Sequence, residues 1–380
     1  MPLRVVQSCR IGLRSSSSTL NHHARPLTTL QSRTLQTSLT STPPVSSGQS
    51  FGGARTATTV STPRFVKIVE CGVRDGLQNE PNTVSVETKL ELLERLANAG
   101  LRAIESGAMV SKKAVPQMAT TAEVLRGLKP HTGVAYPVLV PNVKGLENLL
   151  QLLKSIKEGD GGREAVDEIA IFTAASDSFN KANTNKSVAD SLIELEKVTQ
   201  LALDYKLRVR GYVSTVITCP FEGKVRPKRV KEVGKALLDM GCYEVSLGDT
   251  VGTGTSETVT ALMDEVAIAL PMNKIAVHNH DTYGMAVANV LTALKYGVRT
   301  VDSSVAGLGG CPFSPGATGN AATEDLVHAL HGAGYETGVD LRKLVATGEW
   351  ISEVLGRRNE SRAGRGWSAR WRREETKKAA

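Results

Sequence analysis

The sequence predicts an α/β protein whose parallel strands close into a TIM (β/α)8 barrel. From Phe65 onward, short runs rich in β-branched residues alternate with longer amphipathic stretches, which is typical of parallel α/β architecture. Eight such units fit within about 270 residues, as this barrel requires. The main alternative is an open, doubly wound sheet, which is disfavoured because no Gly-x-Gly-x-x-Gly motif follows the first strand and opens a helix.

The predicted elements follow one another as strand and helix along the chain. In chain order the strands are Val66–Cys71, Ala103–Ser106, Val134–Val140, Glu168–Thr173, Arg208–Val213, Glu244–Leu247, Ile275–Val277 and Thr300–Ser303. Between and after them, apolar residues recur at helical spacing in Val86–Ala99, Leu146–Ile156, Val188–Tyr205, Lys228–Met240, Glu257–Leu270, Ala286–Tyr296, Thr323–Gly332 and Leu341–Leu355. We therefore expect one barrel domain over residues 63–356, with an additional C-terminal helical segment.

The net charge of +8 lies at the two ends of the chain. Residues 1–69 contain eight Lys or Arg and no Asp or Glu, and residues 357–380 contain nine basic and three acidic side chains. The part between them is mildly acidic, so no nucleic-acid partner is predicted. No apolar run approaches the roughly 18 to 20 residues that cross a bilayer, so no membrane span is predicted either. We expect residues 357–380 to form a basic, disordered tail.

The N-terminal 62 residues have the composition of a mitochondrial transit peptide. They are rich in Ser and Thr, carry arginines among small and apolar residues, and lack the apolar core of a secretory signal. We expect a disordered leader over residues 1–62 and a location in the mitochondrial matrix; a polar leader without a targeting role is the alternative. Five cysteines without Cys-x-x-Cys spacing fit a reducing compartment.

A glycine-dense loop over residues 302–325 carries a single cysteine, Cys311. Five glycines between residues 307 and 319 would let this loop open, close and press against a ligand. The segment alone fits a reactive thiol and an inert buried cysteine equally well. Its position after the eighth strand favours the reactive thiol, because barrel active sites lie at the carboxyl ends of the strands.

Other polar side chains follow the strands at this same rim. Arg74 and Asp75 follow the first strand and Glu105 ends the second. His278 and His280 end the seventh strand, and their i, i+2 spacing in extended backbone directs both imidazoles to one face. Two convergent imidazoles with the carboxylate of Asp75 predict a divalent metal site.

The amide oxygen of Asn320 could complete this ligand set. Two nitrogen and two oxygen ligands, with coordination positions left for water or substrate, suit Mg²⁺ or Mn²⁺, whereas a structural zinc site would have cysteine ligands. No other cofactor is predicted.

Three motifs of the chain belong together: Val73-Arg-Asp-Gly-Leu-Gln-Asn-Glu80, Val277-His-Asn-His-Asp-Thr-Tyr-Gly284 and Ser304-Val-Ala-Gly-Leu-Gly-Gly-Cys-Pro312. Taken together, they resemble the 3-hydroxy-3-methylglutaryl-CoA lyase family of TIM-barrel metal-dependent lyases. The resemblance extends over roughly residues 65–356. Claisen-type condensing enzymes on the same barrel, such as isopropylmalate and homocitrate synthases, typically have Arg-Asp-Gly-Glu-Gln and His-x-His-Asn-Asp at these places. This chain has Arg-Asp-Gly-Leu-Gln and His-Asn-His-Asp-Thr instead. The chain departs from the lyase pattern at Ser111-Lys-Lys-Ala-Val-Pro116, where the family usually has Ser-Pro-Lys-Trp-Val-Pro.

The resemblance implies cleavage of 3-hydroxy-3-methylglutaryl-CoA to acetyl-CoA and acetoacetate, the reaction of ketogenesis and leucine degradation. It implies that Asp75, His278, His280 and Asn320 hold the metal. Arg74 would stabilise the enolate of the acetyl thioester. An acyl-CoA thioester is thus the expected ligand, and a homodimer is expected from the resemblance alone.

The remaining roles are also implied by the resemblance. Cys311 would protonate the enolate when its loop closes. Glu105 would contact metal-bound water or position Arg74, and the base for the substrate hydroxyl is Asp75 or His278. Further candidate substrate-binding residues are Gln78, Asn142, Asp249 and Asp325. The alternatives are a condensing enzyme of the same superfamily and a catalytically silent binding barrel.

Overall fold

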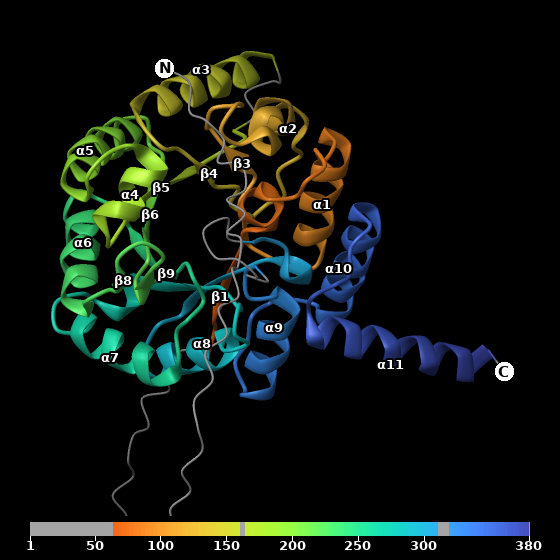
Figure 1. The fold of residues 1–380 in the computed structure, drawn as a ribbon. Helices are drawn as coiled ribbons and strands as arrows, with labels where there is room; N and C mark the ends of the chain where they lie inside the picture. Colours follow the sequence, from red (N-terminus) through yellow and green to blue (C-terminus); the bar gives the residue numbers. More distant parts are fainter. Residues whose placement is uncertain (1–63, 160–163, 311–318, 380) are drawn as a thin grey trace, which may run out of the picture. The chain divides into compact units, whose positions relative to one another are not determined.

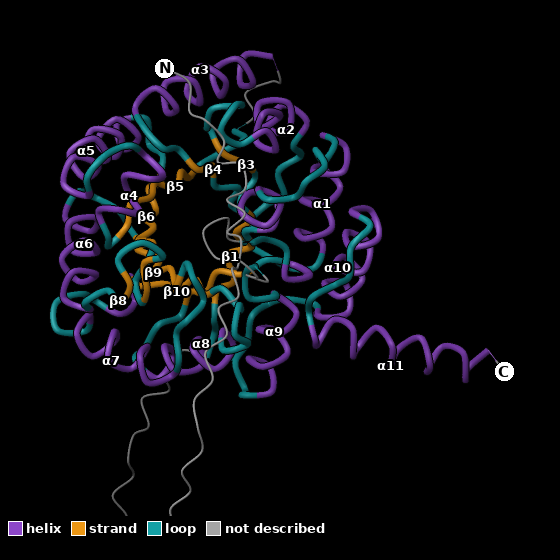
Figure 2. The backbone as a smooth tube through the Cα atoms, viewed as in Figure 1, coloured by secondary structure: helices purple, strands orange, loops and turns teal. Residues whose placement is uncertain are grey.

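The computed structural model describes residues 64–159, 164–310 and 319–379, and nine parallel strands in these ranges form the central sheet. Their spatial order is β2-β1-β11-β10-β9-β6-β5-β4-β3. Their bounds are β1 Lys67–Glu70, β2 Ala103–Ile104, β3 Gly107–Ala108, β4 Val138–Leu139, β5 Glu168–Ala174, β6 Arg208–Ser214, β9 Glu244–Asp249, β10 Ile275–Asn279 and β11 Thr300–Ser303. Figure 2 shows these strands as a ring inside a layer of helices, so the predicted TIM barrel is confirmed.

The barrel closes through the second strand region, which is split in two. β2 pairs with β1 in parallel, whereas β3 pairs with β4 on the other side. Between them, the backbone N–H of Glu105 donates to Glu70 O and that of Ser106 donates to Pro137 O, both at 2.9 Å. The split occurs where the sequence predicted one strand, and it brings Glu105 to the barrel interior.

The helices form the outer layer and match the predicted stretches closely. They are α1 Val86–Asn98, α3 Val143–Gly159, α5 Val188–Asp204, α6 Pro227–Asp239, α7 Ser256–Val266, α8 Ala286–Lys295, α9 Thr323–Gly332 and α10 Leu341–Leu355. Two short helices, α2 Thr121–Gly127 and α4 Asp177–Thr184, and a small hairpin of β7 Thr218–Cys219 with β8 Gly223–Lys224, were not predicted.

Local sequence explains where the helices start and which face they bury. Ser85 and Ser187 accept hydrogen bonds from backbone amides in the first turns of α1 and α5, as N-cap serines do. Along α1, Leu92, Leu93 and Leu96 are buried in the main hydrophobic core. Each such leucine stabilises the fold by about 1.5–3 kcal/mol, and the layer between strands and helices holds the barrel wall in place.

The expected additional C-terminal helical segment is present as α10, but the tail that follows it differs from the expectation. The sequence predicted a disordered tail over residues 357–380, but the structure has a helix, α11, at Arg362–Ala379 (Figure 1). Trp367 and Trp371, one helical turn apart, stack with ring centroids 5.1 Å apart, and Trp367 Nε1 donates to His328 Nδ1 of α9 at 3.3 Å. The prediction of a disordered tail was wrong, because it was based on the basic composition and not on the helical spacing of the two tryptophans.

Two expectations concern segments that bear on location. No helix among the described residues is both long enough and apolar enough to pass through a bilayer. Residues 1–62, the expected transit peptide, lie outside the described residues, and this assignment stays a prediction.

Candidate active site and metal centre

A single helical turn, Gly72–Gly76, carries Arg74 and Asp75 from the end of β1 into the barrel mouth. The backbone N–H groups of Asp75 and Gly76 both donate to Cys71 O, which winds the chain tightly here. A Cβ on Gly76 would lie 2.5 Å from Ser304 Oγ, so only glycine lets this turn pack against the chain after β11. The Arg-Asp pair is therefore fixed to the base of the Cys311 loop.

Arg74 is held between two carboxylates in a buried position. Its Nε donates to Glu105 Oε2 at 2.7 Å and its Nη1 donates to Asp75 Oδ1 at 2.8 Å. The other oxygen of Glu105 accepts a hydrogen bond from Tyr212 Oη at 2.9 Å, and the Arg74 guanidinium lies over the Tyr212 ring. Glu105 thus makes the contact with Arg74 that one of its two expected roles requires, and both roles stay predictions.

The four predicted metal ligands converge on the other side of Asp75. Asp75, His278 and His280 each offer a ligand atom within 4.8 Å of the others. Asn320 joins them because it forms a backbone bridge to His280, and its Nδ2 donates to Asp75 Oδ2 at 2.8 Å. Asn320 Oδ1 is buried and accepts no hydrogen bond within the described part of the chain. Two imidazoles, a carboxylate and an unsatisfied amide oxygen fit a divalent cation.

The electrostatics of this cluster keep its ligands ready to bind a cation. Burial would raise the pKa of Asp75, but the neighbouring Arg74 and the two histidines lower it to about 2. Burial, together with the neighbouring His278, lowers the pKa of His280 to about 4. At neutral pH Asp75 is therefore ionised and His280 is neutral, which are the forms that coordinate metals.

Two buried carboxylates hold the start of the Cys311 loop. Glu70 Oε1 accepts from the backbone N–H groups of Gly72 and Val305 at 2.9 Å each, and Oε2 accepts from Thr323 Oγ1 at 2.6 Å. Glu324 accepts from the backbone N–H of Ala306. Cys311 itself lies outside the described residues, so its role as proton donor stays a prediction.

Sequence reasoning missed Glu70 as a functional residue. The available signal was a carboxylate that follows two apolar residues at the end of β1. Glu324 follows the loop in the sequence, and its hydrogen bonds from Ala306 N make it a second anchor of the loop.

The other candidate substrate-binding residues have local partners. Asp249 is buried and accepts from the backbone N–H groups of Gly252 and Gly254, and Asn142 Oδ1 accepts from Gly145 N in the first turn of α3. Asp325 accepts from Ser361 Oγ and Ala363 N at the start of α11. Gln78 is half-buried just after the Asp75 turn. Substrate contacts by these residues remain a prediction.

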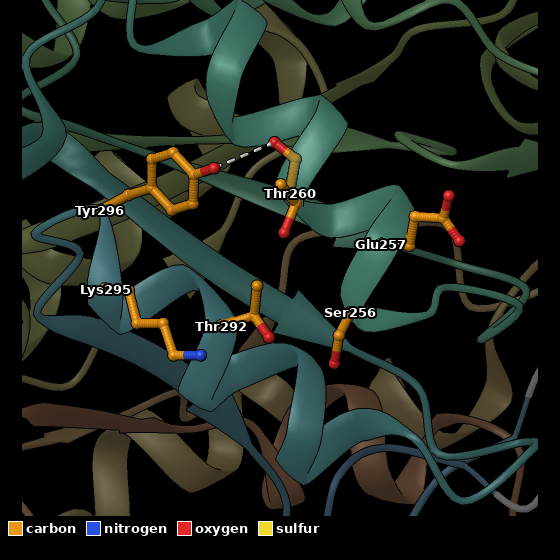
Figure 3. A pocket seen from close by; sticks show the side chains of 6 residues that line it. All are labelled: Ser256, Glu257, Thr260, Thr292, Lys295 and Tyr296. Atoms are coloured by element: carbon orange, nitrogen blue, oxygen red, sulfur yellow. Dashed lines mark hydrogen bonds between the residues drawn. The ribbon is translucent and has the colours of Figure 1, made fainter. Parts of the chain in front are cut away.

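A surface groove on the helix layer is separate from this cluster. It has a volume of about 520 Å³ and lies between α7 and α8. Its lining residues are Ser256, Glu257, Thr260, Thr292, Lys295 and Tyr296 (Figure 3). It contains none of the predicted site residues.

Comparisons with known proteins agree with this geometry. A family model described as HMGL-like matches residues 65–351. The chain is 50% identical to hydroxymethylglutaryl-CoA lyase of Pseudomonas mevalonii over 81% of its own length and 99% of that protein. It is 49% identical to the mitochondrial enzyme of Bos taurus, over 79% and 89% of the two chains. It is 45% identical to the cytoplasmic 3-hydroxy-3-methylglutaryl-CoA lyase of Mus musculus, over 83% and 90%.

Solved structures give the same result. Hydroxymethylglutaryl-CoA lyase from Pseudomonas aeruginosa superposes with a TM-score of 0.76 at 46% identity, covering 81% of this chain and 99% of that one. An HMG-CoA lyase from Acinetobacter baumannii in complex with coenzyme A and 3-methylmalate superposes with a TM-score of 0.73 at 31% identity, covering 80% and 95%. The chain therefore belongs to the HMGL-like family and, within it, to the hydroxymethylglutaryl-CoA lyases.

Proposed function

We propose that this chain is a divalent-metal-dependent carbon–carbon lyase that cleaves 3-hydroxy-3-methylglutaryl-CoA to acetyl-CoA and acetoacetate. The observation that carries the proposal is the convergence of the Arg74–Glu105 pair with the four-residue ligand set at one barrel rim. It is supported by relatives of 45–50% identity that bear this activity in their names.

The residues divide the reaction between them. Asp75, His278, His280 and Asn320 would hold a divalent cation, Mg²⁺ or Mn²⁺, which would supply Lewis acidity toward substrate oxygens. Arg74, locked by Glu105 and Asp75, presents its guanidinium to the thioester oxygen where enolate charge develops.

Two proton transfers complete the cleavage. Cys311 donates a proton to the enolate carbon when its loop closes, and Asp75 and His278 are the two candidates for the base that takes the hydroxyl proton. Closure of the glycine-rich loop keeps bulk water from the enolate.

The proposed cellular location and assembly rest on the N-terminal leader and on the relatives. The relatives include both mitochondrial and cytoplasmic enzymes. The basic, acid-free leader supports import into the mitochondrial matrix and a role in leucine degradation and ketone-body formation. Reporter import by residues 1–60 tests the location, and a cytosolic reporter would contradict it. A homodimer is the proposed assembly, which sedimentation of the metal-loaded protein tests.

One assay tests the reaction against its alternatives. Purified protein is incubated with Mg²⁺ and 3-hydroxy-3-methylglutaryl-CoA, and acetoacetate is measured. A condensing enzyme would instead consume acetyl-CoA with a 2-oxo acid, and a silent barrel would turn over neither. Cys311→Ala is expected to keep metal affinity and to lose about 10²–10⁴-fold in turnover. Unchanged turnover would contradict the role of the thiol.

A further inference from the structure

A buried ion pair lies beneath the candidate metal ligands. Asp302 of β11 and Arg210 of β6 are each only 1% exposed. Arg210 Nη2 donates to Asp302 Oδ1 at 2.7 Å and Nη1 donates to Oδ2 at 3.2 Å. Ser246 Oγ donates to Asp302 Oδ2 at 2.6 Å. The carboxylate is thus fixed in one orientation by three donors from two other strands.

This carboxylate faces one of the candidate ligands. His278 and Asp302 are register partners on the adjacent strands β10 and β11. His278 Nδ1 lies 3.5 Å from Asp302 Oδ2, while His278 Nε2 lies 3.9 Å from Asp75 Oδ2 on the opposite side of the ring. The imidazole therefore spans two carboxylates, one inside the ligand set and one beneath it.

The chemistry of the ring decides which nitrogen carries the proton. A neutral imidazole has one N–H donor and one lone pair. Nδ1 is buried and makes no hydrogen bond within the described residues, and Asp302 Oδ2 is its charged neighbour at 3.5 Å. A lone pair on Nδ1 would be repelled by this negative charge, whereas a proton there is attracted to it. Asp302 accepts from two guanidinium nitrogens of Arg210 and from Ser246 Oγ, which is the donor set of an ionised carboxylate. The proton belongs on Nδ1 and the lone pair on Nε2, toward Asp75.

We propose that Asp302, held by Arg210 and Ser246, is a positioning residue of the metal centre that fixes His278 in the Nδ1–H tautomer and directs its Nε2 lone pair into the ligand set. Carboxylates that accept from metal-binding histidines orient the ring and raise its basicity. This role rests on the metal site of the proposed function. It adds Asp302, Arg210 and Ser246 to the residues that support that site.

The test uses Asp302→Asn in the full chain with two readouts other than turnover. Mn²⁺ is titrated into metal-free protein and followed by electron paramagnetic resonance. Histidine ring nitrogens are observed by ¹⁵N nuclear magnetic resonance in the metal-free protein. We expect about 10–100-fold weaker Mn²⁺ binding, and a shift of His278 away from the Nδ1–H tautomer that the wild type shows.

Glu244→Gln is the matched control. Glu244 is also buried and accepts from Nε of the same Arg210 at 2.7 Å, but its other partners are Thr300 and Lys67. This variant weakens an ion pair of the same arginine without touching His278. Mn²⁺ affinity within threefold of wild type is expected.

The outcomes separate the proposal from the function on which it rests. An unchanged tautomer and unchanged Mn²⁺ affinity in Asp302→Asn would overturn the proposal, as would an equal loss of affinity in Glu244→Gln. Should Asp302→Asn fail to fold, Ser246→Ala removes only the 2.6 Å bond and is expected to give a smaller shift in the same direction; no shift would overturn the proposal. A wild type that binds no Mn²⁺ would contradict the metal site, while the tautomer still decides the role of Asp302.

Discussion

Replacing Glu105 by Gln isolates the charge that holds Arg74 in place. The amide has nearly the same shape, and it can keep its oxygen toward Arg74 and turn its NH₂ group to Tyr212 Oη. What is lost is the negative charge behind two short contacts, from Arg74 Nε at 2.7 Å and Nη2 at 2.6 Å. Hydrogen bonds to a charged group contribute about 1 kcal/mol more than neutral ones, so the free energy of unfolding should fall by about 2 kcal/mol.

The effect on turnover should exceed the effect on stability. With Glu105 neutral, Asp75 is the remaining charged partner of Arg74 at this site, and it draws the guanidinium toward the metal ligands. A displacement of about 1 Å at a reacting centre costs about 10²-fold in rate, so we expect kcat to fall by that factor. The rate of acetoacetate formation gives kcat and KM, and unfolding in guanidinium chloride gives the free energy of unfolding.

Glu168→Gln provides the control for Glu105→Gln. Glu168 is buried, accepts from Tyr243 Oη at 2.8 Å and pairs with Arg208 at 2.8 Å. It therefore has the same kinds of partner, but it lies at the first residue of β5, the end of the strand opposite the active rim. Its replacement should lower stability and leave kcat unchanged. A Glu105→Gln enzyme with kcat within threefold of wild type, or an equal loss of kcat in Glu168→Gln, would refute the reasoning.

Three further predictions concern the loop anchor, the metal and the C-terminal helix. Burial raises the pKa of Glu70 to about 7, so its contribution to stability is complete below pH 4.5 and is lost as the pH rises through 7. In wild type this change lowers the free energy of unfolding by about 3 kcal/mol between pH 4.5 and 7, and in Glu70→Gln that decrease should disappear. A urea midpoint as pH-dependent as that of wild type would contradict this. Chelation should abolish activity and lower Tm, because a metal at 100 times its Kd stabilises the fold by about 2.7 kcal/mol; a Tm insensitive to added Mg²⁺ or Mn²⁺ would argue against the site. Asp325→Ala should speed amide exchange in α11 by removing its first-turn acceptor, at a cost of about 1 kcal/mol. A residue that only caps the helix would leave KM unchanged, whereas a raised KM would support the predicted substrate-binding role of Asp325.

The sequence predicted the barrel and its active rim because both follow from one-dimensional patterns. Strand and helix periodicity located the elements, and the rule that strand ends meet at one rim brought Arg74, Asp75 and the two histidines together. The split of the second strand at Glu105 was not predicted, because it depends on pairing with two neighbours at once.

The partners of buried charges were also beyond the sequence. Alternation along β6 and β11 can place Arg210 and Asp302 inside the barrel, but only the spatial order of strands makes them partners. Glu70 is similar, since two of its donors, Val305 and Thr323, follow it by more than 230 residues. Helix α11 was missed for another reason: its charge suggested disorder, while the Trp367–Trp371 pair gave it a packed face.

Two adjacent residues of α9 decide which parts of the C-terminus can be engineered. Glu324 holds Ala306 at the base of the Cys311 loop, and a Cβ on Gly348 of α10 would lie only 2.1 Å from its carboxylate. Asp325 holds the first turn of α11. A deletion that removes α11 therefore takes away partners of Asp325, the residue next to the one that holds the base of the Cys311 loop. A tag or fused domain placed after Lys378 lies more than three helical turns from that support, and is the safer way to label this enzyme.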